Sequence, residues 1–171
     1  MNIALTGFMA TGKTRISKEL SKLLKFDRID TDGEIVKIAN MSINDIFAIH
    51  GEEHFRGLEK EVCKKASMLD NTVISTGGGL VLDKENLTSL RQNGIIVNLD
   101  ADFSVIEARV QKASRTRPLM KNSSIEEIKA RFESRKPFYA DCDLSIKISD
   151  KKTPKEHAQI IVNELKSAKL I

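Results

Sequence analysis

The segment from Gly7 to Thr14 reads GFMATGKT, which is a glycine, four variable residues and then Gly-Lys-Thr. In such a loop, backbone N–H groups hold phosphate oxygens, the lysine reaches the β- and γ-phosphates, and the threonine hydroxyl binds Mg²⁺. A following helix adds the positive end of its dipole. A glycine-rich turn with a chance lysine is the alternative, but an apolar stretch before the motif and a helical pattern after it favour a nucleoside triphosphate site. Its predicted residues are Ala10, Thr11, Gly12, Lys13, Thr14 and Arg15.

Two carboxylates, Asp30 and Asp32, occur in the sequence IDTDG at the end of a predicted strand. Ligands of open α/β sheets bind at the carboxyl ends of the strands. In an extended segment, side chains two residues apart point to the same side. One carboxylate could hold Mg²⁺ through water beside Thr14, and the other could accept a proton from a hydroxyl or orient it. Alternatively, Asp32 caps a helix that begins near Gly33.

A run of glycines, Gly77, Gly78 and Gly79, directly follows another predicted strand and Thr76. Glycines at the end of a strand leave bare backbone that a ligand can approach closely. A tight loop without a ligand is the alternative. Because this loop and the carboxylates fall at the same predicted edge of the sheet, we favour a ligand contact.

Arginines form the third group of candidates. Arg135 follows Phe132 by three residues and so extends the apolar side of its predicted helix, where its guanidinium needs an internal carboxylate or a bound anion. The pattern alone predicts a solvated Arg56 paired with Glu59 one turn later. Arg115 and Arg117 lie in a polar, basic segment and could neutralise a transferring phosphoryl group, or simply be solvated.

Composition narrows the function classes. The chain has 171 residues, a net charge of +4 and no tryptophan, and its basic residues are scattered, which argues against a nucleic-acid partner. Cys63 and Cys142 lack metal-ligand spacing, so two reduced thiols of a cytoplasmic protein are expected. The sequence has no signal-peptide pattern and no apolar run of membrane-spanning length. We therefore expect a cytoplasmic monomer that binds small anionic molecules and no membrane.

Strand-like and helical patterns alternate along the chain, which predicts a parallel sheet covered by helices on both faces. We expect one domain over residues 1–171, with a helical substrate-binding insert at about residues 33–61 and a lid at about residues 112–124. Thr153 and Pro154 mark the start of the last helix. The predicted strands are Ile3–Leu5, Arg28–Thr31, Thr72–Thr76, Ile95–Leu99 and Leu144–Ile148.

The combination of motifs resembles the shikimate kinases. The segments GFMATGKT, IDTDG, MSINDIFAIHGEEHFRGLE, STGGG, RTRPLM and RKPFY occur in the order and approximate spacing of that family and cover nearly the whole chain. The resemblance implies a three-layer P-loop kinase fold of the nucleoside monophosphate kinase type, with a five-stranded parallel sheet in the order 2-3-1-4-5. It also implies transfer of the γ-phosphate of ATP to the 3-hydroxyl of shikimate, a step of aromatic amino-acid biosynthesis.

The same resemblance implies roles for particular residues. Asp32 resembles the acid that binds shikimate hydroxyls and serves as general base, and Asp30 the acid that supports Mg²⁺ through water. Arg56 and Arg135 resemble the arginines that hold the shikimate carboxylate, which reverses the reading of Arg56 from pattern alone. Arg117 resembles the lid arginine that contacts the phosphates.

The resemblance further implies that Glu59 orients Arg56, that the glycine loop contacts substrate through its backbone, and that the segment KISDKKTP lines the adenine. The chain departs from the family in having Ala10-Thr11 where Gly-Ser is common and Thr14 where serine is common. The lid is about one residue longer, which leaves the roles of Arg109 and Arg115 open.

Two other functions compete with this prediction. A different small-molecule kinase of the same fold, such as a gluconate kinase, would share Lys13 and Thr14. A GTP-dependent switch would match Asp30–Gly33 as a DxxG motif, but that motif follows the phosphate loop too closely, and the sequence has no NKxD motif.

Overall fold

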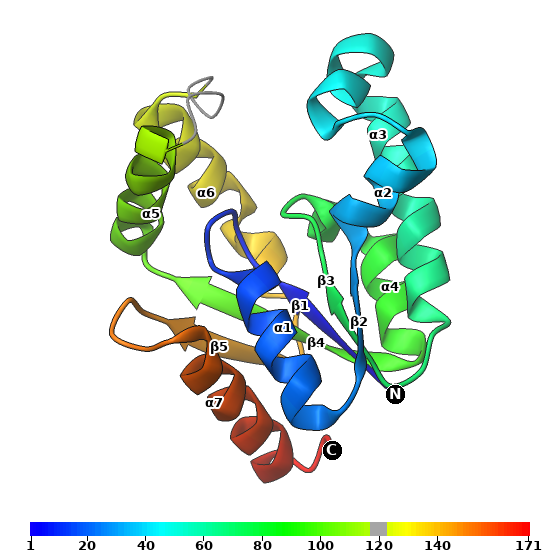
Figure 1. Ribbon diagram of the computed structural model, residues 1–171, viewed down its shortest axis with the longest axis vertical. Coiled ribbons are helices and arrows are strands. Elements are labelled where there is room, and N and C mark those ends of the chain that lie inside the picture. The colour runs from blue at the N-terminus through cyan, green and yellow to red at the C-terminus, as the bar shows by residue number, and fades with distance from the viewer. Residues whose placement is uncertain (117–122) are drawn as a thin grey trace.

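The computed structural model describes residues 1–116 and 123–171, with the side chains of residues 114–116 also left out of the description. Five strands form one sheet, and all the neighbouring pairs are parallel, in the order β2-β3-β1-β4-β5 (Figure 1). This is the predicted order. The strands are β1 (Asn2–Thr6), β2 (Asp27–Asp30), β3 (Thr72–Ser75), β4 (Gly94–Ala101) and β5 (Leu144–Ile148).

Helices cover both faces of the sheet, as the alternating sequence pattern predicts. Helix α1 packs along α7 on one face, and α4 packs on the other with α3 beside it (Figure 1). The helices are α1 (Lys13–Leu24), α2 (Thr31–Ala39), α3 (Ile43–Ser67), α4 (Lys84–Gln92), α5 (Phe103–Thr116), α6 (Ile125–Tyr139) and α7 (Pro154–Ser167), with a short 3-10 helix, η1, at Leu80–Leu82.

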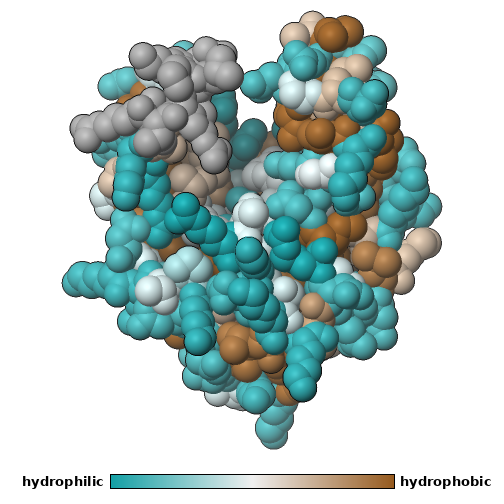
Figure 2. Space-filling model, in the orientation of Figure 1, coloured by the Kyte–Doolittle hydropathy of each residue, from teal (hydrophilic) through white to brown (hydrophobic). Residues whose placement is uncertain are grey.

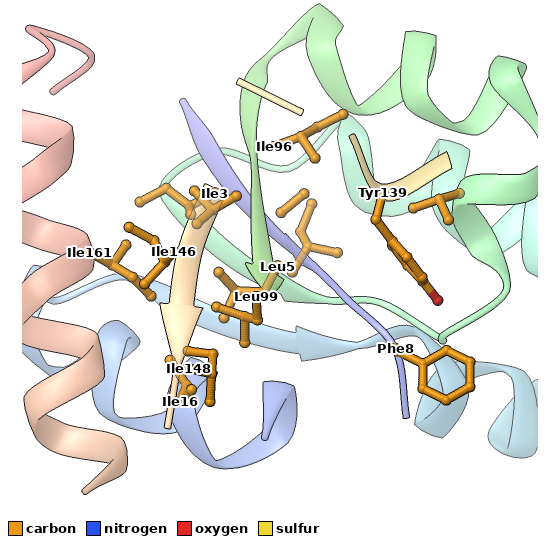
Figure 3. Close-up of a cluster of buried hydrophobic side chains, with 14 of the residues drawn as sticks. Ile3, Leu5, Phe8, Ile16, Ile96, Leu99, Tyr139, Ile146, Ile148 and Ile161 are labelled. Carbon is orange, nitrogen blue, oxygen red and sulfur yellow. The ribbon is translucent and has the colours of Figure 1, made fainter. Parts of the chain in front are cut away.

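The hydrophobic core fixes the sheet between these helices. Alternate side chains of a strand point to opposite faces, so Ile3 and Leu5 pack with Ile161 of α7 while Ile96 points to the face of Tyr139 (Figure 3). Ile3 and Leu5 are fully buried. This rigid frame brings the carboxyl ends of β1, β2 and β3 to one edge.

The insert between β2 and β3 contains α2 and α3, which pack on each other around a separate small cluster of buried residues that includes Ile35 and Phe55. Gly51 interrupts α3 with a φ of 82° and a ψ of 174°. Only glycine adopts that conformation without strain. The break divides α3 into two helical pieces.

Three helices begin at caps that the sequence encodes. Ser124 and Thr153 each form a reciprocal capping box with the glutamate three residues later, at the starts of α6 and α7. Each box satisfies two N–H groups that lack a helical partner. Ser42 caps α3 by accepting from the Asp45 N–H at 3.1 Å. Within the described part of the chain, no helix is long and apolar enough to cross a membrane.

Candidate functional site

The segment between β1 and α1 forms the predicted phosphate loop. Gly12, with a φ of 99°, precedes Lys13 at the first position of α1, and no side chain in the described residues caps this helix. Its first N–H groups therefore remain a positive site for an anion. Thr11 is buried, and its hydroxyl donates to the Phe8 carbonyl at 2.8 Å, which fixes the loop.

Ala10 takes a left-handed conformation with a φ of 61°. Glycine adopts this conformation at lower cost than alanine, so the Gly-to-Ala departure noted in the sequence carries backbone strain. The Ala10 carbonyl accepts a hydrogen bond from Arg109 Nη1 at 2.8 Å. Arg109 also donates from Nε to Asp150 Oδ1 at 2.8 Å. Arg109, which the sequence left without a role, thus joins the phosphate loop to the loop after β5.

Lys13 lies within the phosphate loop. Its ammonium donates to the carbonyls of Gly7 at 2.7 Å and Phe8 at 2.9 Å. Burial lowers the pKa of Lys13 to about 8, and the carboxylates of Asp32 and Asp30 oppose part of this shift. Two acids next to an ammonium and a helix N-terminus make a compact charged site that a phosphate and a cation could enter together.

Asp30 and Asp32 do not share an extended segment, so the expectation that they point the same way along a strand is wrong. Helix α2 begins at Thr31, and Asp30 is its cap, with Oδ1 accepting the Gly33 N–H at 3.4 Å. Asp32 consequently lies in the first helical turn and is not the cap. The two carboxylates still reach one site, because Asp30 Oδ2 accepts from the Thr14 hydroxyl at 3.4 Å while Asp32 faces the glycine loop.

The glycine loop leaves no room for side chains at two of its positions. A Cβ atom on Gly77 would lie 2.5 Å from Asp32 Oδ1 and 3.1 Å from Glu59 Oε1. A Cβ atom on Gly79 would lie 2.5 Å from Arg56 Nη1. The absence of side chains at these two positions therefore lets the acids and the guanidinium pack against the backbone. The predicted contact between this loop and a ligand stays a prediction.

Arg56 and Glu59 form the predicted ion pair, with Arg56 Nη1 2.7 Å from Glu59 Oε2. Arg56 also reaches Glu52 at 3.2 Å, and its side chain is 28% exposed. Glu59 is buried and its Oε1 atom has no hydrogen-bond partner among the described residues. Burial raises the pKa of Glu59, whereas Arg56 and, more weakly, Arg135 lower it.

Arg135 is half-buried on α6. Its charge lowers the pKa of Glu59 and also that of Tyr139, so Arg135 acts electrostatically on the same buried carboxylate that Arg56 contacts. The direct ion-pair partner of Glu59 is Arg56, and Arg135 contributes only as a weaker charge. Asp32 lies beside this group, and burial raises its pKa, with Asp30 adding to the shift and Lys13 and Arg56 opposing it.

A cavity of about 1110 Å³ joins the phosphate loop to Asp32 and the glycine loop. Its lining includes the phosphate loop, Asp30, Asp32 and Gly78 on one side and residues of α5 and the loop after β5 on the other. Figure 2 shows the molecule hollowed between the α2–α3 projection and the α5–α6 projection. The loop Asp150–Pro154 contributes to this lining, and its contact with the base stays a prediction.

Some residues that the sequence predicted for the site are not among its described side chains, or are exposed. Arg117 and most of the predicted lid lie outside the described residues, and so does the side chain of Arg115. Arg15 lines the cavity, but its side chain is exposed. Sequence reasoning placed Asp150 in the segment that lines the adenine but did not predict its ion pair with Arg109, and it gave Tyr139 no individual role. Both contacts join residues that are distant in the sequence.

The fold and this site define a P-loop phosphotransferase, in which a second group of acidic residues and arginines lies beside the phosphate loop. The sequence profile of the shikimate kinase family matches residues 9–166. The shikimate kinase of Caldanaerobacter subterraneus subsp. tengcongensis is 46% identical over 162 residues, which cover 94% of each chain.

Solved structures of shikimate kinases share this fold. A shikimate kinase from Aquifex aeolicus superimposes with a TM-score of 0.84 at 36% identity, over 99% of both chains. One from Acinetobacter baumannii in complex with shikimate gives a TM-score of 0.89 at 29% identity, over 99% of this chain and 95% of that one. The chain belongs to the shikimate kinase family.

Proposed function

We propose that this protein transfers the γ-phosphoryl group of ATP to the 3-hydroxyl of shikimate, giving shikimate 3-phosphate and ADP for aromatic amino-acid biosynthesis. The observation that carries the proposal is the ion pair of Arg56 with the buried Glu59, a carboxylate on which the charge of Arg135 also acts, beside Asp32 and the glycine loop. Two guanidinium groups next to a hydroxyl-binding carboxylate suit a small cyclic acid that carries hydroxyls.

The nucleotide half of the proposal rests on the phosphate loop. Lys13 and the open N-terminus of α1 bind the β- and γ-phosphates, and Arg109 with the loop Asp150–Pro154 encloses the base. Arg117, which lies outside the described residues, contacts the phosphates in this proposal.

The residues present fit a magnesium ion. The hydroxyl of Thr14 and the carboxylate of Asp30 are 3.4 Å apart, and both offer the hard oxygen ligands that Mg²⁺ prefers. Asp30 would act through water. No group of three or more acidic, histidine or cysteine side chains that could hold a metal occurs among the described residues, which suits an ion shared with phosphates and water. When bound, Mg²⁺ neutralises charge on the β- and γ-phosphates.

The protein's own groups then need to do little covalent chemistry. The 3-hydroxyl oxygen attacks the γ-phosphorus as the bond to the β–γ bridging oxygen breaks, and ADP leaves with that oxygen. Asp32 aligns the hydroxyl and accepts its proton. Burial raises the pKa of Asp32 and so makes it a better proton acceptor than an exposed aspartate. We further propose that the protein is a cytoplasmic monomer that acts on small molecules and has no nucleic acid or membrane as partner.

The test is ADP release by the purified protein with shikimate, with gluconate and with no acceptor, using either ATP or GTP. We expect turnover with ATP and shikimate only. Gluconate is a stringent control because it carries both a carboxylate and hydroxyls. Turnover of gluconate without turnover of shikimate would refute the acceptor, and a strong preference for GTP would refute the nucleotide.

A further inference from the structure

The glycine loop Thr76–Gly79 is held by a different element at each position. The N–H and hydroxyl of Thr76 donate to the Leu5 carbonyl of β1 at 3.1 and 2.9 Å. The Gly77 N–H donates to the hydroxyl of Thr31, the first residue of α2, at 3.0 Å. The first half of the loop is thus fixed to the central strand and to the helix that carries the acceptor-binding aspartate.

The second half of the loop is fixed by α6 and α3. The Tyr139 hydroxyl of α6 donates to the Gly78 carbonyl, and Gly79 packs directly on the guanidinium of Arg56. Tyr139 is 7% exposed, and Figure 3 shows its ring beside the core with the hydroxyl pointing toward the side where Phe8 lies. Burial raises the pKa of Tyr139 to about 12, so it remains a protonated donor near neutral pH.

Arg135 lies one helical turn before Tyr139 and interacts with it. We infer that Tyr139 is a positioning residue, whose hydrogen bond to Gly78 fixes the end of α6, and therefore Arg135, relative to Arg56. This inference rests on the proposed function, because the two arginines matter only if they hold one carboxylate together. A forked hydrogen-bond arrangement depends on geometry as well as charge. A shift of α6 therefore weakens acceptor binding even though both guanidinium groups remain.

The hydroxyl can be removed with a limited effect on folding. Gly78 lines the cavity of about 1110 Å³, whose polar lining includes Asp32 and Thr76. Such a polar cavity admits water, which can satisfy the Gly78 carbonyl when the hydroxyl is absent. The ring itself stays in the core. A water bridge replaces the hydrogen bond but does not reproduce its fixed distance.

The experiment compares Tyr139→Phe with Ser134→Ala, which removes an exposed hydroxyl from the same helix. For Tyr139→Phe we expect the KM for shikimate to rise about fivefold to tenfold, the effect of one lost hydrogen bond on binding. The KM for ATP and the unfolding midpoint should change little, and Ser134→Ala should match the wild type. An unchanged KM for shikimate, or equal rises in both KM values, would overturn the inference.

A double-mutant cycle separates positioning from a general loss of structure. In an Arg135→Ala background, Tyr139→Phe should add little to the KM for shikimate, whereas a purely structural effect would add in full. The KM for a shikimate analogue without its carboxylate should not respond to Tyr139→Phe. If Tyr139→Phe is insoluble, Tyr139→Met removes the same hydroxyl and repeats the test. Failure of the wild type to phosphorylate shikimate would refute the proposed function instead.

Discussion

Gly79→Ala tests whether the glycine loop and Arg56 form one binding surface. The added Cβ atom would lie 2.5 Å from Nη1, 2.7 Å from Nη2 and 2.9 Å from Cζ of Arg56. Gly79 has a φ of −99°, which alanine also adopts, so the backbone tolerates the change. All the strain therefore falls on the guanidinium, which is the end of a long side chain and can move away.

The size of the effect follows from these distances. Because favourable non-bonded separations are about 3.5–4.0 Å, the guanidinium must move by about 1 Å. If Arg56 holds the acceptor's carboxylate as proposed, these hydrogen bonds are charge-assisted, and losing them costs roughly 1.5–3 kcal/mol, which is roughly a 10- to 150-fold rise in the KM for shikimate. The free energy of unfolding should change by less, because the side chain of Arg56 is 28% exposed and its end can move without displacing the backbone.

The assay is ADP release at varied shikimate and, separately, at varied ATP, with urea unfolding of the same samples. Gly57→Ala is the matched control, because it lies next to Arg56 in α3 and a Cβ atom there meets nothing within 4 Å. It should leave both KM values unchanged. In an Arg56→Ala background, Gly79→Ala should have little further effect. A normal KM for shikimate in Gly79→Ala would show that Arg56 does not hold the acceptor.

Three other predictions concern single residues. Gly51→Ala should lower the free energy of unfolding by on the order of 1–3 kcal/mol, because a φ of 82° with a ψ of 174° strains any residue other than glycine. If urea unfolding showed the same stability for Gly51→Ala and Gly57→Ala, this prediction would be wrong. Because the pKa of Lys13 is about 8 and only the protonated ammonium attracts phosphate, the affinity for ATP measured by calorimetry should fall as the pH rises above about 8. Lys13→Arg should move that fall to higher pH, and an affinity that stays constant to pH 10 in the wild type would refute the assignment. Asp32→Asn should lower kcat by on the order of 10²–10⁴, and a kcat near that of the wild type would remove Asp32 from the reaction.

The fold followed from the sequence because its signals are local. Thr153 and Pro154 mark the start of α7, and strand and helix patterns alternate as a parallel sheet requires. The error at Asp30 and Asp32 is also local in origin. Either aspartate could have capped α2, and only the hydrogen bond from Gly33 to Asp30 decides which one ends the strand.

The acceptor site was less predictable because its parts meet only in three dimensions. Helical phase alone predicted that Arg135 needs an anion, but it could not show that its charge acts on Glu59, which lies on α3. Tyr139 received no individual role, since its partner is a backbone carbonyl that no side-chain pattern encodes. Asp150 was expected only as part of a segment at the adenine, and its ion pair with Arg109 was not predicted.

These contacts explain why a loop of three glycines lies at the centre of the site. Gly77 gives space to Asp32 and Glu59, and Gly79 gives space to Arg56. A Cβ atom on Gly78 would lie 3.7 Å from the Met9 backbone nitrogen, so the same loop also borders the phosphate loop. A side chain that moved this loop would therefore displace Asp32, Glu59 and Arg56 and also the neighbouring phosphate loop. Phosphoryl transfer depends on holding two substrates in line, and a bare backbone shared by both halves of the site satisfies that requirement.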